Sequence, residues 1–201
     1  MKRAVLITPM VSEIVPFDEA DYIGVDAGAL LLLHKRMPMK CAVGDFDSMD
    51  ETQFQKLEAA VKIYQHPVMK NETDSELAIR LCIENGYDDV ILEGGLNGRI
   101  DHTIANLRLL MYRYPQVTIL DGDQMVRILR PGTYRVDTPV KHVSFFAVEP
   151  SVLTLRGFLY PLEHRSIVPS DIFTVSNSLD GKEGQIIVEA GKVLYICSNE
   201  R

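Results

Sequence analysis

The chain has 201 residues, 46% of them hydrophobic, so it can bury a sizeable core as one domain or as two small ones. Its 28 acidic residues outnumber 21 basic residues, giving a net charge of −7, and it has no Lys/Arg-rich run, which argues against a nucleic-acid partner. No apolar stretch approaches the roughly 20 residues of a membrane span, and the three cysteines are far apart, so we expect a cytoplasmic protein without disulfides or a zinc site.

The first part of the chain alternates short aliphatic or β-branched runs with helical patterns. This alternation is typical of a mostly parallel α/β sheet flanked by helices. The predicted strands are 4–8, 22–25, 41–43, 61–64, 90–92 and 117–120, and the predicted helices are 28–35, 50–60, 74–85 and 101–114. In the last helix, Ile104, Leu107, Leu110 and Met111 recur at helical spacing and predict one apolar face.

After residue 121 the pattern changes to short apolar runs separated by turn residues. Runs at 142–148, 186–188 and 193–197 are divided by Gly- and Pro-containing turns. Such spacing is typical of a small antiparallel β sandwich. We therefore expect two domains, an α/β domain at 1–125 and a β-sandwich domain at 126–201.

Two aspartates follow the predicted strand 41–43. Asp45 and Asp47 are two residues apart, so in an extended segment their side chains point the same way, at the end of the strand where ligands of α/β sheets collect. Carboxylates this close repel each other unless a cation lies between them, which predicts a Mg²⁺ site. Alternatively, Ser48 and Glu51 predict a capping box for the next helix, which would account for Ser48 but for neither aspartate.

A second polar turn, at 70–74, precedes the next predicted helix. Asp74 would add an acidic oxygen for the metal, and Lys70 would supply a positive charge for a phosphate. Thr73 and Glu76 also predict a capping box, so this turn alone leaves a purely structural role open. The repetition favours function, because successive strand-to-helix turns of one sheet converge on one crevice.

A glycine-rich turn follows the strand 90–92. Gly94, Gly95 and Gly98 would let backbone N–H groups approach phosphate oxygens, and Arg99 would fork onto a phosphate. The spacing is neither the dinucleotide-binding fingerprint nor a Walker loop. Asn106 lies on the helix that follows and would face the same crevice.

Two segments of the second domain contain candidate pocket residues. Tyr160 lies at a predicted turn and would wall a pocket, or else pack within the sandwich. Ser176 and Asn177 lie at a polar strand end whose simplest explanation is a turn held by side-chain hydrogen bonds. Neither segment indicates a function by itself.

Taken together and in this order, these motifs resemble the thiamine pyrophosphokinase family. The resemblance implies an α/β catalytic domain, a thiamine-binding β sandwich and a homodimer with active sites at the subunit interface. It also implies transfer of diphosphate from ATP to the hydroxyl of thiamine, with release of AMP. The motifs that carry the resemblance are Asp26-Ala27-Gly28, 44–48, Thr73-Asp74, 94–102 with Asn106, 157–162 and Ser176-Asn177.

The resemblance also implies roles for individual residues. Asp45, Asp47 and Asp74 match acids of the metal and diphosphate site, and Asp74 or Asp47 would take the hydroxyl proton. Asp101 and Ser176 would contact the aminopyrimidine of thiamine. The ATP phosphates would be bound by Lys70, Gly94, Gly95, Gly98 and Arg99, and thiamine by Asp101, Asn106, Tyr160, Ser176 and Asn177.

Three positions depart from the family pattern and keep alternatives open. Asn71 replaces a frequent aspartate, Asn97 replaces a frequent glycine, and Ser178 replaces a frequent acid. One alternative is a pyrophosphokinase with another acceptor, such as a pterin alcohol. Another is a non-catalytic sensor of thiamine or nucleotide, although a binding protein has no need for a full set of charge-neutralising groups.

Overall fold

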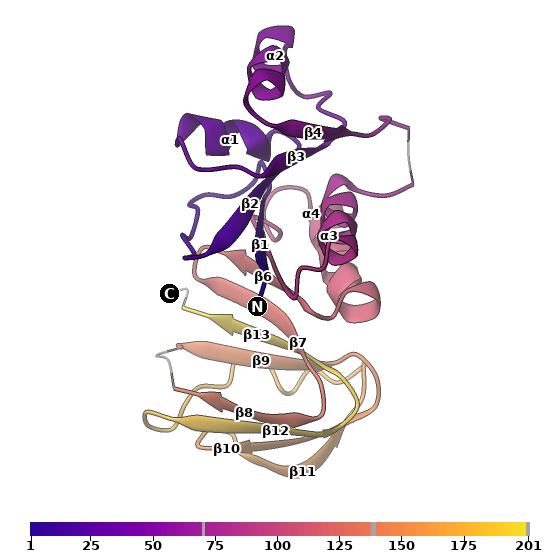
Figure 1. Cartoon of the computed structure of the whole chain (residues 1–201). Coiled ribbons are helices and arrows are strands. Elements are labelled where there is room, and N and C mark those ends of the chain that lie inside the picture. Colours follow the sequence, from indigo (N-terminus) through magenta and orange to yellow (C-terminus); the bar gives the residue numbers. More distant parts are fainter. Residues whose placement is uncertain (70, 138–139, 200–201) are drawn as a thin grey trace. The chain divides into compact units, whose positions relative to one another are not determined.

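The computed structural model describes residues 1–69, 71–137 and 140–199. The chain divides into two compact units, Met1–Gly122 and Asp123–Arg201. Within the described ranges, no helix combines the length and the apolar character needed to cross a lipid bilayer. Figure 1 shows the elements of both units.

The first unit is an α/β fold built on parallel strands. They lie in the order β4-β3-β2-β1-β5-β6, so the chain winds outward from β1 to β4 and then returns to the other side of β1 with β5. A crevice for ligands is expected where the order reverses, at the carboxyl ends of β1 and β5. The strands are β1 Arg3–Ile7, β2 Ala20–Val25, β3 Cys41–Gly44, β4 Lys62–Gln65, β5 Asp89–Glu93 and β6 Val117–Asp121.

Helices cover both faces of this sheet. Val5 and Ile7 of β1 share a buried cluster with Leu32 of α1, while Figure 1 shows α3 and α4 on the other side of these strands. The α helices are α1 Gly28–His34, α2 Glu51–Ala60, α3 Asp74–Glu84 and α4 Ile100–Arg108. Gly28 is required at the start of α1, because a Cβ there would lie 2.0 Å from the Ile7 carbonyl oxygen.

The predicted helix 101–114 is helical as far as Arg113, but it changes type in its second half. α4 ends at Arg108 and continues as the π-helix η1, Leu109–Arg113, which the Tyr114 N–H closes by donating to the Leu109 carbonyl at 2.7 Å. On the predicted apolar face, Ile104 is 51% exposed, whereas Leu109 and Leu110 are buried. The wider turn places these two consecutive leucines in the core and lets Arg113 pair with Glu76 of α3.

The second unit is a sandwich of two antiparallel sheets. β7 Gln124–Leu129, β13 Val193–Ser198 and β9 His142–Ala147 form one sheet in that order. The other runs β11-β10-β12-β8, with β8 Gly132–Val136, β10 Ser151–Arg156, β11 Leu162–Ile167 and β12 Gly184–Ala190.

The two sheets of the second unit share one core. Phe145 of β9 and Leu153 of β10 are both fully buried in it. The Phe145 ring meets the Phe158 ring edge-on at a centroid distance of 6.3 Å. The predicted fold class, a mostly parallel sheet with helices followed by an all-β domain, is therefore confirmed.

Candidate active site

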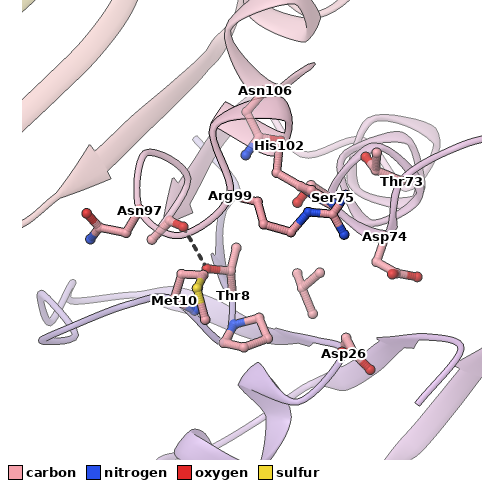
Figure 2. Close-up of a pocket in the computed structure, with 13 residues that line it drawn as sticks. Thr8, Met10, Asp26, Thr73, Asp74, Ser75, Asn97, Arg99, His102 and Asn106 are labelled. Atoms are coloured by element: carbon pink, nitrogen blue, oxygen red, sulfur yellow. Dashed lines mark hydrogen bonds between the residues drawn. The ribbon is translucent and has the colours of Figure 1, made fainter. Parts of the chain in front are cut away.

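A cavity of about 210 Å³ lies at the carboxyl ends of β1, β2 and β5, where the strand order reverses. Figure 2 shows side chains entering it from these strand ends and from the starts of α3 and α4. Its position is therefore the one expected for a ligand site in an open α/β sheet. The lining residues are Thr8, Pro9, Met10, Val25, Asp26, Thr73, Asp74, Ser75, Gly94, Asn97, Arg99, His102 and Asn106.

Asp26 is the acid most enclosed by this arrangement. It follows β2 directly with a φ of 48°, a conformation in which few side chains other than those of Asn and Asp settle. The Ser48 hydroxyl donates to its Oδ2 at 3.1 Å, while its buried Oδ1 has no hydrogen-bond partner among the described residues. Burial raises the pKa of the Asp26 carboxyl, and the charges of Asp74 and Asp45 raise it further.

The negative charges of Asp45 and Asp74 are therefore close enough to Asp26 to act on its carboxyl group. Asp26 belongs to one of the motifs that resemble the family, but it was not among the predicted site residues. The same sequence feature that selected Asp45, an acid directly after a buried strand, also holds for Asp26.

The predicted acids are placed at different depths. Asp74 is the first residue of α3 and lines the cavity, and Thr73 before it caps the helix by accepting from the Glu76 N–H at 3.2 Å. Asp45 is half-buried after β3, and Asp47 is exposed; neither lines the cavity itself. The Asp47 N–H donates to the Asp45 carboxylate at 3.4 Å, which keeps the two residues in one turn.

The predicted capping box of Ser48 and Glu51 is wrong. Asp50 caps α2 instead, with its carboxylate accepting from the Gln53 N–H and the Gln53 side chain accepting from the Asp50 N–H. Ser48 binds Asp26, a residue 22 positions earlier in the chain. The serine is therefore part of the acidic site and not of the helix cap.

The glycine-rich turn is held open by buried polar contacts. Gly94 has a φ of +79°, and a Cβ there would lie 2.4 Å from Thr8 Oγ1, which donates to the Gly94 carbonyl at 2.9 Å (Figure 2). The side chain of Asn106, 6% exposed, donates to the Gly95 carbonyl at 2.9 Å. Gly98 also has a positive φ, of 84°. The backbone of this turn can thus approach a ligand closely.

Two buried acids that the sequence analysis missed support the same turn. Asp121 accepts from the Leu96 N–H at 2.9 Å and from the Asn97 side chain at 2.5 Å, so Asn97, a departure from the family pattern, anchors the loop. Glu93, 1% exposed, accepts from the Val15 N–H at 3.0 Å. Both acids lie at strand ends, and this position in the sequence was the feature that could have identified them.

Arg99 is the cation that lines the cavity among the described residues. Its side chain projects inward from the glycine-rich turn (Figure 2) and pairs with Asp101 at 2.6 Å. This pairing holds the pKa of the Asp101 carboxyl below its usual range. Asp101 is exposed in the first turn of α4 and does not line the cavity. Lys70, the other predicted cation, lies outside the described residues.

The carboxylates suit Mg²⁺ chemically, although their positions do not form a complete coordination shell. In the described part of the chain, no group of three or more His, Cys, Asp or Glu side chains is close enough to hold a metal. The fit rests on Asp26, whose buried Oδ1 has no hydrogen-bond partner among the described residues and on which the charges of Asp74 and Asp45 act. Carboxylate oxygens are the ligands that Mg²⁺ prefers.

The remaining predicted substrate residues belong to the second unit. Tyr160 is 69% exposed, while Asn177 is 5% exposed and bonded through both ends of its amide to the Tyr160 backbone, at 3.1 and 2.8 Å. Ser176 has a φ of 60°, and its N–H donates to the Ser144 hydroxyl at 3.0 Å. Asn177 therefore presents Tyr160 to solvent, and the roles of these residues toward a substrate stay predictions.

Comparisons with known proteins agree over nearly the whole chain. The catalytic-domain model of thiamin pyrophosphokinase matches residues 17–120, and the vitamin B1 binding domain model matches residues 133–193. Thiamine pyrophosphokinase of Bacillus subtilis (strain 168) is 30% identical over 187 residues, which cover 89% of this chain and 87% of that protein.

Solved structures agree with these sequence matches. The crystal structures of the Bacillus subtilis enzyme and of a family protein from Enterococcus faecalis superpose with TM-scores of 0.88 and 0.87. Each is 26% identical, over 100% of both chains. The predicted family and enzyme class are thereby confirmed: the chain belongs to the thiamin pyrophosphokinase family.

Proposed function

We propose that the chain transfers the terminal diphosphate of ATP to the hydroxyl of thiamine, giving thiamine diphosphate and AMP. The observation that carries this proposal is the cavity at the strand-order reversal. Asp26, Asp74 and Arg99 line it together with Gly94 of the glycine-rich turn. Transfer of phosphoryl groups needs charge neutralisation and alignment more than covalent help from the protein, and this set of groups supplies both.

The acids serve the metal in this proposal. Asp45, Asp47 and Asp74 would hold Mg²⁺, as the sequence predicts, and Asp26 would join them because its buried Oδ1 has no partner in the part of the chain that the structure describes. When bound, the ion would neutralise charge on the phosphate oxygens. The phosphates would bind along the glycine-rich turn at Gly94, Gly95 and Gly98. The N–H groups of Gly95 and Gly98 would donate to them, whereas Gly94, whose N–H donates to the Leu120 carbonyl at 3.1 Å, would only let the phosphate come close.

Arg99 and Lys70 complete the phosphate site. The Arg99 guanidinium exchanges its pairing with Asp101 for a phosphate oxygen, which it binds as a fork. The thiamine hydroxyl oxygen attacks the β-phosphorus, the bond from that phosphorus to the oxygen of the α-phosphate breaks, and AMP leaves. The hydroxyl proton passes to Asp74 or Asp47.

Five residues would bind thiamine in this proposal. Asp101 and Ser176 would contact the aminopyrimidine, Tyr160 would wall the pocket, and Asn106 and Asn177 would line it. Support comes from the vitamin B1 binding domain match, which includes Tyr160, Ser176 and Asn177. An acidic site also suits a cationic substrate electrostatically.

We further propose a cytoplasmic homodimer with active sites at the subunit interface. On α4, the apolar residues Ile100 and Ile104 are 72% and 51% exposed, and in the second unit Ile172 and Phe173 are 75% and 50% exposed. Large exposed apolar side chains of this kind mark association surfaces. The cysteines are buried and free, as expected in a reducing compartment.

The test is to incubate the purified protein with ATP, Mg²⁺ and thiamine and to follow AMP and thiamine diphosphate by chromatography. Both products should form together and disappear with EDTA. If thiamine is inert while a pterin alcohol is converted, the acceptor is wrong; if thiamine binds without turnover, the chain is a sensor.

A matched pair of variants tests the acids. Asp47→Ala should lower turnover by about a hundredfold or more, because one negative charge of the metal site is lost. Asp18→Ala removes an equally exposed aspartate away from the cavity and should leave turnover unchanged. Normal activity of the Asp47 variant would remove that residue from the metal site.

A further inference from the structure

A second cavity, of about 300 Å³, lies in the α/β unit at the opposite ends of the strands. Cys41 opens β3 and Lys62 opens β4, and both line it, whereas the active-site cavity gathers residues from carboxyl ends of strands. Asn85, the residue that follows α3, lines the same cavity. The two cavities share no lining residue.

The charge of this second cavity is opposite to that of the chain. Lys2, Lys40 and Lys62 line it, and among the described residues no Asp or Glu does, in a chain of net charge −7. The Lys40 ammonium lies 3.6 Å from the carboxylate of Asp21, a residue that does not line the cavity. Lys2 donates to the Asn85 carbonyl at 2.9 Å, so this ammonium is satisfied by a neutral group.

Lys62 is satisfied in the same way. Its ammonium donates to the Tyr64 hydroxyl at 2.9 Å, and in the described ranges no carboxylate lies within 4 Å of the Lys2 or Lys62 ammonium. Two of the three ammonium groups, those of Lys2 and Lys62, therefore have no carboxylate partner among the described residues, which favours an anion.

The floor of the cavity is apolar and uncharged. Ile23 is 2% exposed and Cys82 is fully buried, and burial raises the pKa of the Cys82 thiol to about 12 and that of Cys41 to about 11. Both thiols are therefore neutral at physiological pH. The rings of Tyr64 and Tyr87 also line the cavity, and the Lys62 and Lys2 ammonium groups lie over them at 4.4 and 3.9 Å from the ring centroids. Ligand sites commonly combine such an apolar lining with a few charged groups.

We propose that this lysine cavity, defined by Lys2, Lys40, Lys62 and the floor beneath them, binds a small organic phosphate that carries an aromatic ring. The phosphate would contact the three ammonium groups at the rim, and the ring would lie against the apolar floor. The site goes beyond the proposed reaction and does not depend on it, because no residue of the active-site cavity takes part.

The probe is phenyl phosphate, titrated calorimetrically into the protein without ATP or Mg²⁺. Phenol has only the aromatic ring of this probe and inorganic phosphate only its anionic group, so each should bind more weakly than phenyl phosphate. The double variant Lys40→Gln/Lys62→Gln should weaken binding by about tenfold, because two exposed charge contacts are lost. Lys56→Gln, which removes an exposed lysine of α2 outside the cavity, should change affinity less than twofold.

A second variant distinguishes binding in the lysine cavity from binding in the active site. Arg99→Gln should leave phenyl phosphate affinity unchanged, because Arg99 lines the other cavity. Loss of binding in Arg99→Gln with retention in the double lysine variant would place the probe in the active site and overturn the proposal. Absence of binding to the unaltered protein would overturn it as well, whatever the outcome of the turnover assay.

Discussion

Glu93 offers a quantitative test of how the active-site loops are supported. It ends β5, is 1% exposed, and holds the loop after β1 by accepting from the Val15 N–H. Its other carboxylate oxygen is buried without a hydrogen-bond partner among the described residues. Burial raises the pKa of Glu93 from 4.5 to about 7, the Val15 hydrogen bond lowers it, and the charge of Asp121 raises it.

The sign of the pH effect follows from this shift. Between pH 4.5 and about 7 the folded chain holds a proton on Glu93 that the unfolded chain has lost, so stability falls as pH rises through this window. The shift corresponds to about 3 kcal/mol at about 1.4 kcal/mol per pH unit. The contribution is fully present below pH 4.5 and lost above about pH 7.

Glu93→Gln should remove this dependence, because the amide keeps an acceptor for the Val15 N–H and does not ionise. The free energy of unfolding of variant and unaltered protein, from urea titrations at several pH values between about 5 and 8, should diverge by about 3 kcal/mol in favour of Gln as pH rises. Glu58→Gln, at an exposed position of α2, should follow the unaltered protein. A pH-independent difference for Glu93→Gln would refute the reasoning.

Three further substitutions test separate parts of the account. Asp26→Asn should lower kcat by about a hundredfold with an unchanged circular dichroism spectrum, because it removes a buried charge of the site; an unaltered kcat would exclude Asp26. Asp50→Ala should cost about 1 kcal/mol of unfolding free energy in urea titrations by removing the α2 cap, with kcat unchanged; unchanged stability would contradict the cap. Gly94→Ala should lower kcat/KM for ATP at least about tenfold, since its Cβ would meet Thr8 at 2.4 Å; an unchanged value would show that the turn can adjust.

Much of the fold could be predicted because it depends on local patterns. Buried runs such as 41–43 and 90–92 are short, aliphatic and followed by polar turns, and they lie within β3 and β5. Parallel strands bring the turns at their carboxyl ends to one edge of the sheet. The alternation of strands and helices was therefore enough to predict that Asp74 and Arg99 approach one cavity.

The parts that failed depend on contacts between distant residues. Ser48 has a suitable local cap spacing, but Asp26 takes its hydroxyl once β2 lies beside β3, and Asp50 takes the cap. The π-turn after Arg108 depends on the core positions of Leu109 and Leu110, which helical periodicity cannot specify.

The central claim is that two phosphorus atoms move from ATP to thiamine as one group. The most direct measurement uses ATP labelled in turn at the β- and γ-phosphorus, with thiamine and Mg²⁺, and follows each label into products. Both labels should appear together in thiamine diphosphate, with one AMP released per product. Label from the γ-phosphorus alone, in thiamine monophosphate with ADP, would contradict the account.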